Sequence, residues 1–380
     1  KGTTNGDATD ANGKSSLITG QTLPFTLIVT YLGYVKKEVL IKGGKVEISL
    51  EPLTNQLEDV VISSRRRKES AQEVPIPISV IGGTRAEDAG AFNVSRLKEL
   101  VPTVQLYASN ARNTTLNIRG LGSTFGLTND GIDPGVGFYV DGVYYARPAA
   151  TALDFIDIER VEVLRGPQGT LFGKNTTAGA FNIATRAASF DPGANFELSY
   201  GNLGYIQAKA SLTGPISKKL AARVSFTGTQ RNGTFFNVHT QLPINDINNI
   251  GVRGQLLYTP NDKVNITLIG DISDQKPTGY GWPVAGVVTT KRAGYRQFNS
   301  IIADLGYSIP YQNAFERKLD LDTPSKADNQ MGGISANADI KIGKGTLTST
   351  TAWRFWKWVP LNDRDYIGLP VFTISSGNSV

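Results

Sequence analysis

The sequence contains no cysteine and only one histidine, His239, among its 380 residues. The absence of cysteine excludes a disulfide framework, a thiolate metal site and a cysteine nucleophile. A single histidine also excludes a histidine-rich metal centre or a pair of catalytic histidines within this chain. We therefore expect no metal site and no resident cofactor. His239 lies in a polar stretch, and we interpret it as a surface residue.

Long hydrophobic runs are also missing. No stretch approaches the roughly 18–20 apolar residues that a membrane-spanning helix requires, and the longest run, residues 27–35, is far too short. The chain begins at Lys1 with neither an initiating methionine nor the apolar segment of a secretory signal peptide, so we expect an internal or processed start. If this protein crosses a membrane, the sequence predicts that it does so with strands.

The charge pattern does not favour a nucleic-acid partner. The net charge is +6, but the only dense basic run is residues 65–68, and basic and acidic residues are interspersed elsewhere. Such a run is typical of a solvated linker. Charged residues make up 19% of the chain and apolar residues 40%, which excludes a disordered chain. The 41 glycines and 18 prolines follow no repeat, which favours a protein with many turns.

Four segments of the chain differ in pattern, in keeping with two or three domains for this length. Residues 1–53 predict a small β unit, and residues 54–73 have the composition of a linker with one apolar patch. Residues 74–190 alternate helix and strand signals around the hairpin dipeptide Asp141-Gly142, which predicts an α+β domain. Residues 191–380 alternate apolar and polar residues with a period of two. The strand-like stretches of the first segment are residues 26–34, 37–41 and 45–50.

The last segment predicts seven antiparallel strands with one apolar face and one face that carries Arg, Lys, Asp and Gln. Each is about as long as the ~9–11 residues that cross a bilayer when tilted. A soluble sandwich alternates in the same way, so alternation alone leaves both architectures open. The seven candidate strands are residues 196–200, 206–212, 220–227, 252–258, 264–272, 334–342 and 347–355.

The connections between these strands separate the two architectures. Residues 214–217, 259–262 and 343–345 are tight turns, whereas the chain wanders over residues 231–248 and 274–329. Outer-membrane barrels have short periplasmic turns and long extracellular loops, and a structureless loop of ~50 residues is uncommon in a compact soluble domain. The pattern therefore favours a transmembrane β-barrel.

Two further expectations follow from a barrel. If the short turns lie on the periplasmic side, the seventh strand runs toward the outer surface of the membrane. An aromatic girdle near its outer end would then include Trp353, Phe355, Trp356 and Trp358. The alternative is an aromatic cluster in a core. Seven strands cannot close, and an open edge in lipid leaves backbone groups unpaired at several kcal/mol each. We therefore expect roughly fifteen more strands after Val380, which would complete a plugged barrel of ~22 strands.

The densest motif lies between the linker and the strands. Residues 158–173 read IERVEVLRGPQGTLFG, and residues 175–183 read NTTAGAFNI. NIRG at residues 117–120 and FYVDGV at residues 138–143 precede them. In order and spacing these motifs resemble the plug domain of TonB-dependent outer-membrane receptors. LEDVVI at residues 57–62 resembles the TonB box, so that the resemblance covers about residues 54–230.

The resemblance implies a mainly β fold in which an α+β plug domain is followed by the first strands of a large antiparallel transmembrane β-barrel. Residues 9–14 and 29–34 resemble a carboxypeptidase-regulatory-like β domain, which often precedes such receptors. Only the later strands of that domain are matched, so we expect residues 1–53 to be a truncated copy.

The resemblance also implies three groups of functional residues. The segment that binds TonB would be Leu57, Glu58, Asp59, Val60, Val61 and Ile62. Contacts between plug and barrel would come from Arg119, Glu159, Arg160, Glu162 and Arg165. Ligand contacts would come from the apical plug loops, with Tyr107, Asn110, Arg112, Asn113, Phe125, Asn129 and Asp130.

Physical chemistry supports these assignments. A flexible β-branched segment suits strand addition to a partner's sheet, although residues 60–62 could also be a buried strand that continues the first domain. The guanidinium groups of Arg119 and Arg165 can fork onto carboxylates of a barrel wall. Residues 169–174 are similar to a phosphate-binding loop, but three residues separate the glycines where four are required.

The function implied by the resemblance is import of a scarce ligand across the bacterial outer membrane, driven through TonB by the inner-membrane proton-motive force. Lipid of the outer membrane would surround the barrel. A ferric siderophore is the first expectation for the ligand, with a glycan or a peptide as the alternative. A non-transporting adhesin or signalling receptor and a secreted soluble β protein also remain open. We expect no enzyme, because no nucleophile–base pair or metal cluster is visible.

Overall fold

The computed structural model divides the chain into two compact units, Lys1–Val61 and Ile62–Val380, which are described separately. The residues that it describes are 6–10, 13–31, 34, 36–51, 61–62, 69–70, 74–91, 93–108, 114–122, 133–147, 150, 154–311, 313–363, 365–370 and 373–375. No helix among these residues is both long enough and apolar enough to span a membrane.

The first unit contains one antiparallel pair of strands, β1 (Phe25–Val29) and β2 (Lys37–Ile41), with Phe25 opposite Ile41. Two of the three strands expected here are therefore present. The third prediction, residues 45–50, is wrong, because these residues form no strand. A strand exists only where a neighbour completes its hydrogen-bond ladder, and sequence pattern alone does not show whether that neighbour is there.

The second unit begins with an α+β plug built on a five-stranded sheet of order β10-β9-β12-β11-β5. Its strands are β5 (Ile78–Gly82), β9 (Val136–Val140), β10 (Val143–Tyr144), β11 (Ile158–Arg165) and β12 (Gly179–Thr185). A second sheet contains β6 (Val104–Ala108), β7 (Thr114–Ile118) and β8 (Leu121–Gly122), and the short helices are α1 (Gly83–Asp88), α2 (Val94–Leu97) and α3 (Gly169–Phe172). β9 and β12 run parallel, and the other neighbours in the five-stranded sheet are antiparallel.

The plug has its own hydrophobic core, centred on β11 between β12 and β5. Val161, Val163 and Phe181 are fully buried there. Glu162 is also fully buried, and its carboxylate accepts hydrogen bonds from Arg160 Nε at 2.8 Å and Asn182 Nδ2 at 2.9 Å. Because a buried carboxylate is costly unless its oxygens are paired, the plug motif combines apolar residues with this polar pair.

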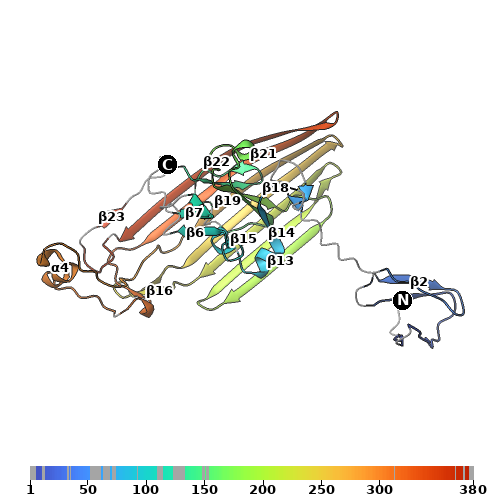
Figure 1. The fold of residues 1–380 in the computed structure, drawn as a ribbon, viewed down its shortest axis with the longest axis horizontal. Coiled ribbons are helices and arrows are strands. Elements are labelled where there is room, and N and C mark those ends of the chain that lie inside the picture. Colours follow the sequence, from blue (N-terminus) through green and yellow to red (C-terminus); the bar gives the residue numbers. More distant parts are fainter. Residues whose placement is uncertain are drawn as a thin grey trace. The chain divides into compact units, whose positions relative to one another are not determined.

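The seven predicted long strands are all present, as consecutive neighbours in one antiparallel sheet that ends with an additional short strand. They are β13 (Gly193–Gly201), β14 (Tyr205–Ser217), β15 (Leu220–Arg231), β18 (Ile247–Asn261), β19 (Val264–Gln275), β21 (Lys326–Ile342) and β22 (Gly345–Asp363), followed by β23 (Thr373–Ser375). Figure 1 shows these strands side by side, with the long connections, α4 and β16 at one end of the sheet.

The long connections contain secondary structure of their own. The first holds β16 (Phe235–Asn237) and β17 (Leu242–Ile244), and the second holds η2 (Gly294–Arg296), α4 (Phe298–Asp304), η3 (Ala314–Glu316) and β20 (Lys318–Leu319). β16 pairs with both β17 and β20, and Ile244, Leu319 and Leu321 form a small core beneath them. The two connections therefore fold together into one structured module.

The two faces of the long sheet have opposite chemistry. Its outer face exposes large apolar side chains, among them Phe196, Leu212, Val224, Leu268, Ile334 and Trp353. The face toward the plug buries polar side chains, among them Gln207, Arg223, Thr227, Thr229, Arg253, Gln255 and Ser273. A soluble sandwich buries its apolar face against a second layer, whereas this sheet buries its polar face. The arrangement is that of a membrane barrel around a polar plug.

The predicted aromatic girdle is only partly correct. The side chain of Trp353 is 62% exposed on the outer face, and its ring contacts that of Phe355. Trp356 and Trp358 instead pack against the hydrophobic core of the plug. Side chains alternate along a strand, so these two residues share the inner face with Arg354. Counting aromatic residues without this alternation led to the error.

Candidate functional site

The candidate site is the interface between the plug and the inner face of the barrel strands. Three plug carboxylates make its polar contacts. Asp141 lies at the turn between β9 and β10, where it adopts a positive φ of 49°. Asp154 and Asp157 belong to the segment that leads into β11, in which Asp157 has a positive φ of 56°. Each carboxylate contacts side chains from the barrel strands.

Asp157 is held by charged partners. Its carboxylate accepts hydrogen bonds from Arg223 Nε at 2.5 Å and Nη2 at 3.0 Å, and from Ser225 Oγ at 2.6 Å. Arg186 of the plug lies 3.3 Å away on another side. Burial raises the pKa of Asp157, but the hydrogen bonds and the two positive charges outweigh it, so the pKa lies below its usual value. Asp157 is therefore a stable anion in this interface.

Asp154 is buried among neutral partners. It accepts hydrogen bonds from Thr229 Oγ1 at 2.7 Å and from Asn249 Nδ2 at 3.0 Å. Thr229 Oγ1 in turn accepts a hydrogen bond from Gln207 Nε2 at 2.9 Å. Burial penalises the charged form of Asp154 more than the hydrogen bonds from Thr229 and Asn249 and the positive charge of Lys209 favour it. The pKa of Asp154 therefore rises to about 6.

Asp141 joins the plug to a chain of alternating charges. It forms an ion pair with Arg253, which also donates to Asp271 Oδ1 at 3.0 Å. Arg354 donates to both oxygens of Asp271 at 2.8 Å and stacks over the ring of Tyr145, 4.4 Å from its centroid. The chain thus runs from the plug through β18 and β19 to β22, and it returns to the plug at Tyr145.

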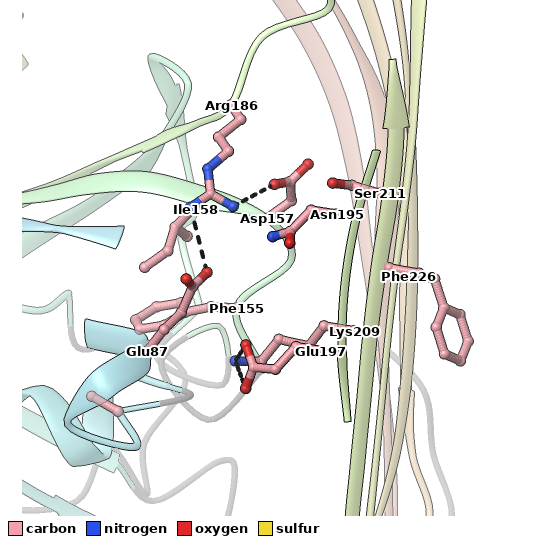
Figure 2. Close-up of a pocket in the computed structure, with 12 residues that line it drawn as sticks. Glu87, Phe155, Asp157, Ile158, Arg186, Asn195, Glu197, Lys209, Ser211 and Phe226 are labelled. Carbon is pink, nitrogen blue, oxygen red and sulfur yellow. Dashed lines mark hydrogen bonds and ion pairs between the residues drawn. The ribbon is translucent and has the colours of Figure 1, made fainter. Parts of the chain in front are cut away.

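A small cavity lies beside the Asp157 contacts (Figure 2). Its volume of about 30 Å³ has room for one or two water molecules. Figure 2 shows Glu87 and Arg186 of the plug opposite Glu197 and Lys209 of the wall, while Phe226 points to the other side of its strand. Arg186 lies 3.6 Å from Glu87, and Lys209 lies 3.3 Å from Glu197. The interface here is polar on both sides.

The motif residues expected to touch the barrel make the following contacts within the plug. Arg165 donates to Thr103 Oγ1 at 3.0 Å and to Ser79 Oγ. Arg160 forms ion pairs with Glu159 at 2.6 Å and Glu162 at 2.8 Å. The exposed Arg119 has a positive φ of 54°, and its backbone N–H donates to Thr103 O. Contact of these residues with the barrel stays a prediction.

Most of the other predicted site residues lie outside the described part of the chain. Of the ligand-binding residues, Tyr107 is described, and its side chain is 66% exposed at the end of β6. Asn110, Arg112, Asn113, Phe125, Asn129 and Asp130 are not described. Leu57, Glu58, Asp59 and Val60 are likewise outside the described residues. Val61 and Ile62 form β3, which pairs with β4 (Glu69–Ser70).

Sequence reasoning missed the three carboxylates that dock the plug. The sequence indicates Asp141 as part of a hairpin turn and of the FYVDGV motif, with no contact to the barrel implied. Asp154 and Asp157 stand just before the densest motif and belong to no recognised pattern. One signal could have found them, because Arg223, Arg253 and Arg354 all occupy the polar phase of their strands. Buried guanidinium groups that face a plug require anionic partners on it.

Residues 70–180 match the family described as the TonB-dependent Receptor Plug Domain. The chain carries a TonB-dependent receptor plug domain. It is 32% identical over 162 residues to the pesticin receptor of Yersinia pestis, a match that covers 42% of this chain and 23% of that protein. It is 26% identical over 203 residues to the vitamin B12 transporter BtuB of Vibrio cholerae, covering 52% of this chain and 31% of that protein.

The fold also matches a solved structure. The ferric yersiniabactin uptake receptor FyuA of Yersinia pestis superimposes with a TM-score of 0.64 at 21% identity, over 80% of this chain and 44% of that one. The family resemblance, the mainly β fold class and the outer-membrane localisation predicted from the sequence are confirmed. The chain spans about a quarter to a third of the length of the two relatives compared above.

Proposed function

We propose that the protein imports a scarce ligand across the outer membrane through a TonB-dependent rearrangement of its plug. The main support is the plug–barrel interface. A plug domain sits against a wall of barrel strands through Asp141, Asp154 and Asp157, whose partners are mostly polar side chains of that wall. Such an arrangement blocks passive flow, yet its hydrogen bonds can be exchanged for water when the plug moves.

TonB is the proposed partner, and residues 57–62 are its proposed binding segment. A β-branched stretch that precedes a plug can add as a strand to the sheet edge of another protein. A pull on this segment would reach β5, the first strand of the plug and an edge strand of its five-stranded sheet. The force would thus act on the β5 edge of the plug sheet, while Asp141, Asp154 and Asp157 hold the plug against the barrel strands.

The TonB assignment can be tested in the full-length protein. Residues 57–62 are replaced by a Gly/Ser segment of equal length, and residues 63–68 are replaced in the same way as the control. We expect the first variant to bind its ligand normally but to lose energy-dependent uptake, and the control to retain both. Unchanged uptake by the first variant would favour a non-transporting surface or signalling receptor.

A ferric siderophore is the proposed ligand. This proposal is supported by the fold similarity to a receptor named for ferric yersiniabactin uptake, and the similarity to a vitamin B12 transporter makes cobalamin the second candidate. Cells that express the protein are grown under iron limitation, and uptake of iron-loaded siderophores, cobalamin and oligosaccharides is compared. Uptake that responds to cobalamin, or to a glycan without any response to iron, would overturn the siderophore proposal.

A further inference from the structure

The segment from Asp154 to Asp157 lies along three neighbouring pairs of barrel residues. Thr229 is opposite Asn249, Thr227 is opposite Gly251, and Ser225 is opposite Arg253 in the β15–β18 ladder. Asp154 binds both members of the first pair, and Asp157 binds Ser225. Ile156 lies beside Gly251 of the middle pair. Three of the four plug residues therefore follow the register of the wall step by step.

Gly251 makes room for Ile156. A Cβ atom built on Gly251 would lie 2.8 Å from Ile156 Cδ1, 3.2 Å from Ile156 Cγ1 and 3.1 Å from Thr227 Cγ2. These distances are too short for ordinary carbon contacts, which lie at about 3.5–4.0 Å. The backbone of Gly251 does not have a positive φ, so its conformation is open to any residue. The glycine therefore permits close packing here rather than an unusual backbone conformation, and a side chain at this position would force Ile156 or Thr227 to move.

This contact differs in kind from the polar contacts on either side of it. The hydrogen bonds of the two carboxylates to the wall fix the segment through directed polar contacts. The partly buried side chain of Ile156 beside Gly251 adds a contact of another kind, because moving it away loses dispersion contacts and exposes apolar surface. The apolar contact is therefore a second, independent constraint on the position of the segment along the wall.

We infer that residues 154–157 are the seat of the plug, and that Ile156 and Gly251 are positioning residues that set its depth and rotation in the barrel. This inference rests on the proposed function, in which the plug closes a path for a ligand. Asp154 and Asp157 align the segment on β15 and β18, and Ile156 sets its register against Gly251. A plug shifted by one pair along the wall would leave Asp154 and Asp157 facing the wrong partners.

The test uses valine substitutions on one strand of the full-length protein in cells. Gly251→Val puts a side chain into the seat. Gly254→Val is the matched control, because a Cβ there would meet nothing within 4 Å. Valine suits a strand at both positions. The measured quantity is entry of a hydrophilic glycopeptide antibiotic too large for general porins, in cells without TonB, so that the result does not depend on energised import.

We expect Gly251→Val to raise antibiotic entry several-fold and Gly254→Val to leave it unchanged. Adding Ile156→Ala to Gly251→Val should restore most of the barrier, because the smaller plug residue accepts the new side chain. Ile156→Asn alone leaves the barrel sequence intact and should also leak, which covers the case in which Gly251→Val does not fold. Equal antibiotic entry for Gly251→Val and Gly254→Val would overturn the inference, even if ligand import by the protein is demonstrated. The same holds if Ile156→Asn admits no more antibiotic than the wild type.

Discussion

The carboxylate of Asp157 and the guanidinium of Arg223 are joined by two hydrogen bonds, at 2.5 and 3.0 Å, although one belongs to the plug and the other to β15. Their side chains are 5% and 10% exposed. A two-point contact of this geometry fixes orientation as well as distance. The plug is therefore held by a directed ion pair that water hardly reaches.

Removing one partner of this pair should destabilise the docked plug. Arg223→Ala leaves the Asp157 carboxylate buried with Arg186 as its remaining cation, and breaking a buried pair in this way typically costs about 3–5 kcal/mol. The thermal unfolding midpoint of the full-length protein in detergent should fall by several degrees. Lys174→Ala is the control, since Lys174 and Asp133 are 3.9 Å apart and 79% and 64% exposed. It should change stability by less than about 1 kcal/mol.

The pH dependence of the docked plug should be governed by Asp154. Its pKa is about 6 in the folded protein against an ordinary value of 3.8, so the protonated form is favoured by folding. The resulting stabilisation is full below the ordinary pKa and is lost as the pH rises through about 6. At about 1.4 kcal/mol per pKa unit, the difference is worth at most about 3 kcal/mol. Asp157, whose pKa is lowered, acts in the opposite direction only in more acidic solution.

Unfolding measured between pH 5 and pH 7.5 can isolate this effect. The wild-type protein should lose stability across this range, and Asp154→Asn should reduce the loss because an amide does not ionise. At pH 7.5 the variant should be more stable than the wild type. A wild-type protein that gains stability from pH 5 to 7.5, or a variant with an unchanged slope, would contradict the assignment.

The sequence predicts the strands of this protein well because their physics is local. Period-two alternation gives every long strand. The tight turn expected at residues 214–217 is wrong, because β14 stays paired with β15 to Ser217 and the chain turns at residues 218–219. The plug motifs likewise indicate the family directly from the sequence. The docking residues were less visible, because a carboxylate such as Asp154 gains its role only when Thr229 and Asn249 are brought to it from 75 and 95 residues away.

The apolar outer face should tolerate a charge poorly. Leu268 lies in the middle of β19 with its side chain half exposed on this face. Leu268→Arg should cost about 2–4 kcal/mol if the face meets the hydrocarbon of a bilayer. The control is Thr350→Arg on β22, an exposed residue on the inner phase of its strand. Folding into phospholipid vesicles, titrated with denaturant, measures both. Equal costs for the two substitutions would speak against a lipid-facing surface.

The tryptophans of β22 report which face of the strand meets lipid. Trp353 is 62% exposed on the outer face. Trp356 faces inward, where its Nε1 donates to Asn329 Oδ1 at 2.7 Å and its ring lies parallel to that of Trp358, 6.4 Å away. Bromine atoms on lipid chains quench only tryptophans that they can approach. We therefore expect brominated lipids to quench Trp353 strongly and the inner pair weakly.

Conservative substitutions identify the quenched residue. Trp353→Phe should remove most of the lipid-dependent quenching while leaving stability nearly unchanged. Trp356→Phe should leave the quenching in place, but it deprives Asn329 of its indole donor and should cost about 1 kcal/mol. The two variants thus separate lipid exposure from packing against the plug. Quenching that survives Trp353→Phe and disappears with Trp356→Phe would mean that the faces of β22 are reversed.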